Sequence, residues 1–120
     1  MDVELIERDG VPIVACAGAI TRAGDALELV SACVERSASR VLVEARHLPP
    51  AFFELRSGFA GEFLQKLQNY RMRVGGVFPP DGAYGERFRE FLLEARRGRS
   101  FRVFDVRAEA EAWLASDAER

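Results

Sequence analysis

The fold is decided by residues 3–15, which read VELIERDGVPIVA. Apolar and polar residues alternate up to Glu7, as in a strand with one buried face. Asp9-Gly10 then separates two apolar runs, which predicts a tight hairpin turn because both central residues must accept a positive φ. Pro12 cannot donate a ladder hydrogen bond, so we expect it at a strand start or facing an edge. The chain therefore begins with a predicted antiparallel strand pair.

Strands and helices are expected to alternate after this hairpin. Strands are predicted at 40–44, 72–78 and 100–106, and helices opening at 21–25 and covering 57–70, 84–95 and 108–114. That order implies parallel pairing with right-handed crossovers. The sequence thus predicts one α/β domain over residues 1–120, with a five-stranded mixed sheet and flanking helices.

Each predicted helix has an apolar stripe that is expected to face the core. The stripes are Leu27, Val30 and Val34 in the first helix, with Ala26 and Cys33 beside them; Phe59, Phe63, Leu67 and Tyr70 in the second, flanked by Ala60 and Leu64; Tyr84, Phe88, Phe91, Leu92 and Ala95 in the third; and Trp113 and Leu114 in the fourth.

The bulk properties argue against two kinds of partner. The formal net charge is −2, so the chain has no overall attraction to nucleic acid. The start of the chain is acidic, and no apolar run approaches the roughly 20 residues of a membrane helix. Cys16 and Cys33 form no metal or redox pattern and are expected to be buried free thiols. These features favour a cytoplasmic protein.

Two glycines near the start of the second helix are unusual. Gly58 and Gly61 each cost about 1 kcal/mol relative to alanine within a helix. We therefore expect the backbone there to approach another group closely. That group is either a neighbouring strand or a ligand or second protein, and the sequence leaves both possibilities open.

The same helix carries a polar stripe. Glu62, Gln65, Lys66 and Asn69 lie at i, i+3, i+4 and i+7 and so share one face. Glu62 and Lys66 are placed to form an ion pair in the favourable orientation. The stripe is either a solvated face or a binding face.

These residues resemble an uncharacterised bacterial family, the domain-of-unknown-function family DUF4180. The resemblance covers essentially the whole chain. It rests on Leu48, Pro49, Phe52, Phe53, Leu55, Gly58, Ala60, Gly61, Glu62, Leu64, Gln65, Lys66, Asn69, Tyr70 and Arg71, and later on Phe91, Glu94, Gly98, Ala112, Trp113 and Leu114. Arg56-Ser57 replaces a Lys-Thr-like pair, and Arg97 an asparagine. The family has no assigned activity, so the resemblance implies a fold and a class but no reaction.

The layout is also similar to STAS-type domains, the fold of anti-sigma-factor antagonists. A strand at 41–45 is followed by Ser57-Gly58 at the start of a helix. In regulatory members the serine at that turn is phosphorylated, so the resemblance implies phosphorylation of Ser57. The aspartate that usually precedes this serine is absent, and Arg56 stands in its place.

The first functional hypothesis is a protein-interaction or regulatory module. A helix N-terminus offers free N–H groups that could hold a phosphate on Ser57, and whichever of Phe52 and Phe53 is exposed would be an apolar anchor. The candidate binding residues are Phe52, Phe53, Glu54, Arg56, Ser57, Gly58, Gly61, Glu62, Gln65, Lys66 and Asn69.

The alternative is a small-ligand-binding protein or an enzyme. No catalytic motif, metal-ligand pattern or cofactor fingerprint occurs, and no catalytic residue, metal or cofactor is predicted. His47 is the single histidine, and Glu62 and Glu94 are the acids best placed for catalysis. An unidentified protein partner is possible, and so is a homodimer that pairs two copies of the first strand.

Overall fold

The computed structural model describes residues 1–116 of the 120-residue chain. The strands form one sheet in the order β1-β2-β3-β4-β5, antiparallel between β1 and β2 and parallel elsewhere. The five-stranded mixed sheet predicted from sequence is confirmed. The strands are β1 (Val3–Arg8), β2 (Val11–Cys16), β3 (Arg40–Glu44), β4 (Arg73–Val77) and β5 (Phe101–Phe104), and the helices are α1 (Asp25–Glu35), α2 (Phe59–Asn69), α3 (Glu86–Ala95) and α4 (Arg107–Ala115).

The first turn is the predicted tight hairpin. Asp9 and Gly10 have φ values of 54° and 80°, so both central residues are left-handed. Arg8 pairs with Val11 across the turn, and the register continues to Val3 opposite Cys16. This local turn therefore fixes how β1 adds to the edge of the sheet.

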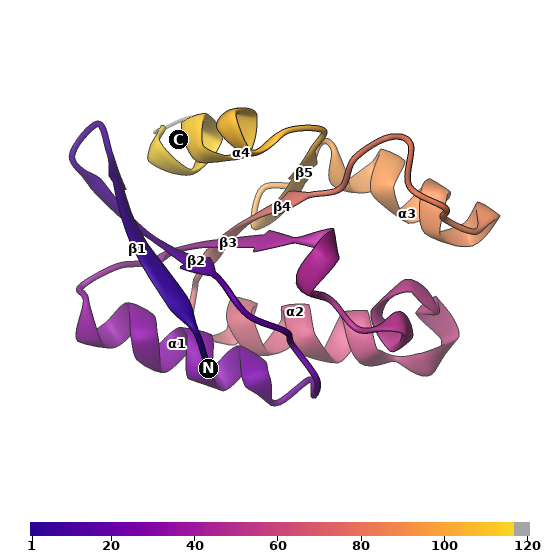
Figure 1. Cartoon of the computed structure of the whole chain (residues 1–120), viewed down its shortest axis with the longest axis horizontal. Coiled ribbons are helices and arrows are strands. Elements are labelled where there is room, and N and C mark those ends of the chain that lie inside the picture. Colours follow the sequence, from indigo (N-terminus) through magenta and orange to yellow (C-terminus); the bar gives the residue numbers. More distant parts are fainter. Residues whose placement is uncertain (117–120) are drawn as a thin grey trace.

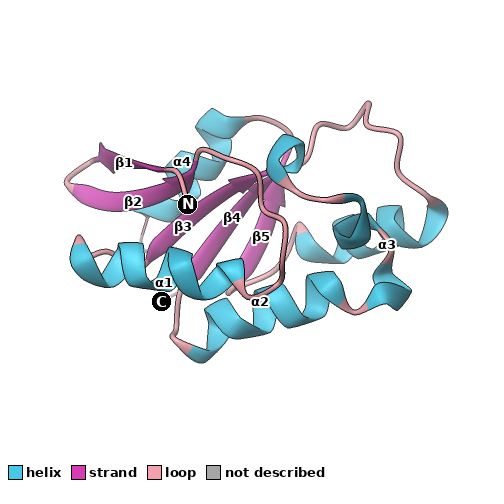
Figure 2. Ribbon diagram, turned by 60° about the horizontal axis from the view of Figure 1, so that its bottom comes forward, coloured by secondary structure: helices cyan, strands magenta, loops and turns pink. Residues whose placement is uncertain are grey.

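Helices cover both faces of the sheet. Figure 1 shows α1 and α2 on one side and α4 on the other, and Figure 2 shows α1 and α2 lying side by side. Successive residues of β2 point to opposite faces. Val14 joins the cluster that contains α1, α2 and α3, whereas Ile13 and Ala15 join the cluster beneath α4. The sheet is thus buried on both sides, as its apolar strands imply.

Helix α4 lies very close to the middle of the sheet. A Cβ atom at Gly75 would stand 3.1 Å from the Leu114 side chain. Leu114 and Trp113 are 0% and 7% exposed, which confirms the predicted inward face of this helix. The glycine in β4 therefore makes room for α4.

The predicted inward face of α1 is partly wrong. Leu27 and Val34 are 42% and 69% exposed, although Val30 is buried. Ala26 and Cys33, which flank the predicted stripe, face the core together with Leu29 and Val30. The buried face of α1 is therefore rotated from the predicted one toward its flanking residues.

Two aromatic residues of the predicted stripes lie just outside their helices. Tyr70 follows the last residue of α2 and is 56% exposed, so it leaves the buried stripe. Tyr84 precedes α3 but is half-buried and packs on the core beside Phe88, as predicted. Cys16 and Cys33 are buried free thiols, as expected, and burial raises the pKa of Cys33 to about 11.

Candidate functional site

Two chain segments leave the sheet at the same edge. β3 and β4 are parallel, so their carboxyl ends lie together (Figure 1). The segment after β3 runs to the start of α2, and the segment after β4 runs over residues 78–85 into α3. Ligands of open α/β sheets bind preferentially outside these carboxyl ends. This edge is therefore the first place to look for a site.

The segment after β3 consists of three short 3₁₀ turns. These are η1 (Ala45–His47), η2 (Pro50–Phe53) and η3 (Leu55–Ser57). Pro49 and Pro50 prevent a continuous helix here, and Pro50 opens η2 because it needs no N–H partner in the first turn. Gly58 then adopts a φ of 80° and redirects the chain into α2.

Phe52 anchors this segment in the core. Its side chain is fully buried, and its ring lies within 6.3 Å of five other phenylalanine rings, measured between centroids. These are Phe53, Phe59, Phe63, Phe78 and Phe88. The rings come from η2, α2, the end of β4 and α3, so aromatic packing holds all of these elements in fixed positions.

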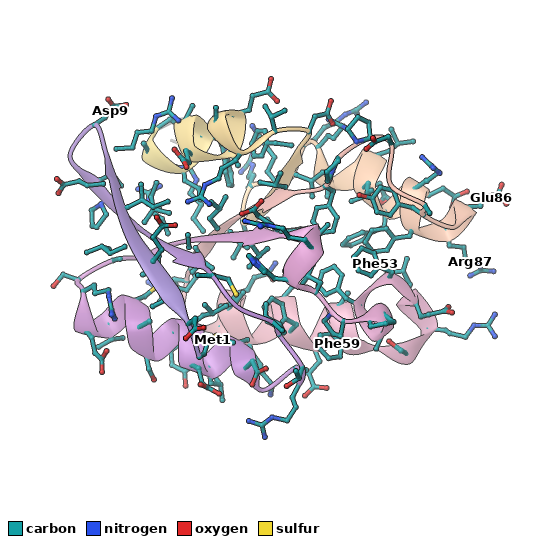
Figure 3. All side chains as sticks on the ribbon, in the orientation of Figure 1. Met1, Asp9, Phe53, Phe59, Glu86 and Arg87 are labelled. Carbon is teal, nitrogen blue, oxygen red and sulfur yellow. The ribbon has the colours of Figure 1, made fainter. Side chains whose placement is uncertain are left out.

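Phe53 lies next to Phe52 but faces outward, between η2 and α3 (Figure 3). Its ring centroid is 5.0 Å from that of Phe88 and 6.0 Å from that of Tyr84. Tyr84 donates a hydrogen bond to the Pro79 carbonyl at 2.9 Å, which holds the loop before α3. Burial and the nearby Asp81 raise the pKa of Tyr84 against the opposing effect of Arg89, so its hydroxyl stays protonated at neutral pH.

A groove of about 860 Å³ separates the η2–η3 segment from α3. We call it the α3 groove. Phe53, Phe88 and Phe91 form its apolar floor, and Phe53 and Phe91 are partly exposed. The remaining lining residues are Glu54, Leu55, Arg56, Ser57, Gly85, Glu86, Arg87, Glu90 and Glu94.

The charged residues of this groove have no ion-pair partner within residues 1–116. They are the four glutamates Glu54, Glu86, Glu90 and Glu94 and the two arginines Arg56 and Arg87, a net charge of −2. On α2, by contrast, Lys66 Nζ lies 3.6 Å from a Glu62 carboxylate oxygen. The α3 groove thus combines an apolar floor with an uncompensated acidic rim.

The structure divides the predicted binding residues into separate places. Phe53, Glu54, Arg56 and Ser57 line the α3 groove, and Phe52 lies buried beneath it. The α2 stripe does not line the groove: Glu62 pairs with Lys66 as predicted, and Gln65 donates to Asn69 at 2.8 Å.

The close approach expected at the two glycines is wrong. A Cβ atom added at Gly58 or Gly61 would meet nothing within 4 Å. Gly58 is required for its left-handed conformation, which costs other residues about 1–2 kcal/mol. Gly61 is exposed on the first turn of α2 and borders open space, so the helix gains no packing from it.

Both hydrogen-bonding roles of the Ser57 hydroxyl are already used. It donates to the Ala51 carbonyl at 2.7 Å and accepts from the Phe59 N–H at 3.1 Å. A phosphate on this oxygen would remove the donated proton and so loosen the link between η2 and η3. Phosphorylation of Ser57 stays a prediction, now placed on the wall of the groove.

Of the α3 side of the groove, sequence reasoning named only Glu94, as an acid placed for catalysis. Glu86, Glu90 and Glu94 repeat every four residues and so share one face of the helix, with Phe91 beside them. The repeat, together with the rule that segments after parallel strands meet, was the signal that could have found it.

Other candidate groups lie away from the groove. His47 is in η1, and its Nδ1 is buried without a hydrogen-bond partner within residues 1–116. Glu94 lines the groove, whereas Glu62 does not. No group of three or more His, Cys, Asp or Glu side chains in the described part of the chain could hold a metal ion. Across residues 1–116, no helix is both long and apolar enough to cross a membrane.

The fold and the groove define a small α/β domain with an open apolar cleft at the carboxyl edge of its sheet. The family described as Domain of unknown function (DUF4180) matches residues 9–114, and the chain belongs to this family. The resemblance expected from the sequence is thereby confirmed. Comparison with curated proteins and with solved structures gave no match, so the similarity to STAS-type domains stays a prediction.

Proposed function

We propose that this protein is a protein-interaction module that binds a peptide segment of a partner protein in the α3 groove. The observation that carries the proposal is the partly exposed pair Phe53 and Phe91 at the bottom of a groove rimmed by unpaired charges. Protein interfaces concentrate their binding energy in a few aromatic anchors, surrounded by a polar rim that excludes water.

A bound segment would not have to disturb the core. Phe52 and Phe88 are 0% and 1% exposed and fix the floor from below. Phe53 and Phe91 pack with tilted rings on Phe88, at 5.0 and 5.3 Å between ring centroids. A rigid floor costs a partner little ordering free energy on binding.

Regulation is the second part of the proposal. Ser57 stands in the groove wall, and its hydroxyl links η3 to η2 through Ala51. Phosphorylation would add about −1.5 to −2 charges at neutral pH. It would also break that link, so both the charge and the shape of the wall would change.

A peptide selection tests the groove directly. Random peptides of about 12 residues, which span about 40 Å when extended, would be displayed on phage and selected on the wild-type protein. The same selection would use Phe91→Ser, in the groove, and Leu93→Ser, which removes a 65% exposed side chain of α3 that does not line it. Circular dichroism would confirm that both variants are folded.

We expect the enriched peptides to bind wild type and Leu93→Ser and to bind Phe91→Ser at least about tenfold more weakly. Enriched peptides that bind Phe91→Ser as well as wild type would place the binding surface elsewhere. A selection that enriches no peptide at all would also contradict the proposal.

A further inference from the structure

We infer that the segment bound in the α3 groove is basic, with Lys or Arg at alternate positions along an extended backbone and an apolar side chain that covers Phe53 and Phe91. The inference rests on the proposed function and names the chemistry of its partner. Its grounds are the charge, the spacing and the freedom of the acidic side chains around the groove.

The first ground is charge complementarity. Three of the four groove glutamates, Glu86, Glu90 and Glu94, lie on α3, while Glu54 lies on the opposite wall. Arg56 and Arg87 leave the groove with a net charge of −2. Complementary charge speeds association and rejects partners of the same sign, so a basic segment is favoured over an acidic one.

The second ground is spacing. Residues four apart on a helix rise about 6 Å along its axis. The carboxylates of Glu86, Glu90 and Glu94 therefore form a row with a repeat of about 6 Å. Alternate side chains of an extended peptide repeat every 7 Å or so and point to one side. A cation at every second position would thus meet one glutamate after another.

The third ground is that these glutamates are free of internal ion pairs. Among the residues that the structure describes, none of the three has a salt-bridge partner. A partner cation would therefore not compete with an arginine or lysine of this chain. The apolar side chain of the bound segment would exclude water from Phe53 and Phe91, next to these carboxylates. The attraction between the carboxylates and a cation would increase there, because the local dielectric constant would fall.

The test extends the peptide selection to two charge variants. The groove variant is Glu86→Gln/Glu90→Gln/Glu94→Gln. The control variant is Glu7→Gln/Asp9→Asn/Glu109→Gln, which removes three exposed acids that do not line the groove and form no ion pair within residues 1–116. Both variants change the net charge by the same amount.

We expect wild type to enrich peptides rich in Lys and Arg at alternate positions. Their affinity should fall at least about tenfold on the groove variant, remain unchanged on the control variant, and decrease as NaCl rises from about 50 to about 500 mM. Equal losses on the two variants would show a general charge effect and overturn the inference.

Two other outcomes separate this inference from the proposed function. In the first, the enriched peptides need Phe91 for binding but are not rich in Lys or Arg, and they bind the groove variant normally. This would overturn the basic partner and leave the groove as a binding site. A selection with no Phe91-dependent peptides would overturn both.

Discussion

Arginines and aromatic rings are used differently on the two sides of the molecule. On the α4 side, Arg107 contacts Glu4, Glu44 and Glu111 at 3.2, 3.3 and 2.8 Å. The hydrogen bond to Glu111 is the largest contribution that raises the pKa of Arg107. Trp113 is covered in turn by the guanidinium groups of Arg73 and Arg102, at 4.1 and 5.2 Å from the ring centroid.

On the groove side, the charged residues that line the groove have no ion pair among the described residues, and the Phe53 and Phe91 rings pack on the core on one side only. Arg87, Glu86 and Glu90 form no ion pair within residues 1–116, and Phe53 and Phe91 stay partly exposed. Helix α4 therefore closes its side of the sheet, whereas α3 and the η2–η3 segment leave a groove open on theirs. Substitutions on the α4 side should therefore change stability, and those in the groove should mainly change binding.

The largest expected effect is at the α4 contact with the sheet. Leu114→Ala should cost about 2–5 kcal/mol, because Gly75 opposite offers no side chain to fill the space. Leu93→Ala, on the exposed side of α3, should cost less than about 0.5 kcal/mol. Urea unfolding measures both changes. Similar decreases in the free energy of unfolding for the two variants would contradict the view that α4 is packed on the sheet more tightly than the exposed side of α3.

The two glycines at the start of α2 should change stability in opposite directions. Gly58→Ala should destabilise the protein by about 1–2 kcal/mol because of its positive φ. Gly61→Ala should stabilise it by about 0.5 kcal/mol, because a methyl group there meets only open space and improves helix propensity. Thermal unfolding would show the pair shifting in opposite directions. A loss of stability in Gly61→Ala would mean that the backbone at Gly61 does lie close to another group, contrary to the structure.

Asp25 is an acidic group satisfied internally, unlike the groove glutamates. Burial acts to raise its pKa, but hydrogen bonds from the Thr21 and Arg22 N–H groups, at 2.9 and 3.1 Å, and the Arg22 charge lower it overall. Asp25→Asn should therefore cost about 1 kcal/mol at pH 7. Because the pKa of Asp25 is lower in the folded than in the unfolded state, its carboxylate stabilises the fold fully above about pH 3.9. This stabilisation is lost as the pH falls through the folded-state pKa.

Chemical unfolding of wild type and Asp25→Asn between pH 7 and pH 3 measures this contribution. The difference between them should be constant near neutrality and shrink below about pH 3.9. A difference that stays the same down to pH 3 would mean that the carboxylate charge contributes nothing.

The smallest effects concern two arginines, the half-buried Arg107 on the α4 side and the exposed Arg87 in the groove. Arg107→Gln should cost about 0.5–1 kcal/mol because it breaks a network of three carboxylates, and the cost should decrease with added salt. Arg87→Gln, in the groove, should change stability by less than about 0.5 kcal/mol. Urea unfolding at low and high salt would compare them, and equal, salt-independent changes would argue against the contrast drawn between the two sides.

Part of the groove could be read from the sequence. Gly58 and Gly61 marked the start of the second helix as unusual, and four of the predicted binding residues beside it do line the groove. The α3 side of the groove could not be predicted in the same way. Glu86 and Phe91 lie some 30 residues further along the chain, and only the parallel packing of β3 and β4 brings α3 beside Phe53.

Sequence patterns alone predicted the hairpin and the order of strands and helices, because turns and periodicity act over a few residues. Tertiary packing decided the rest. It turned Leu29, Ala26 and Cys33 of α1 to the core in place of Leu27 and Val34, and it set α3 opposite η2 and η3. Both outcomes depend on how closely a helix can lie on the sheet. That distance is set by the volumes of side chains that are far apart in the sequence.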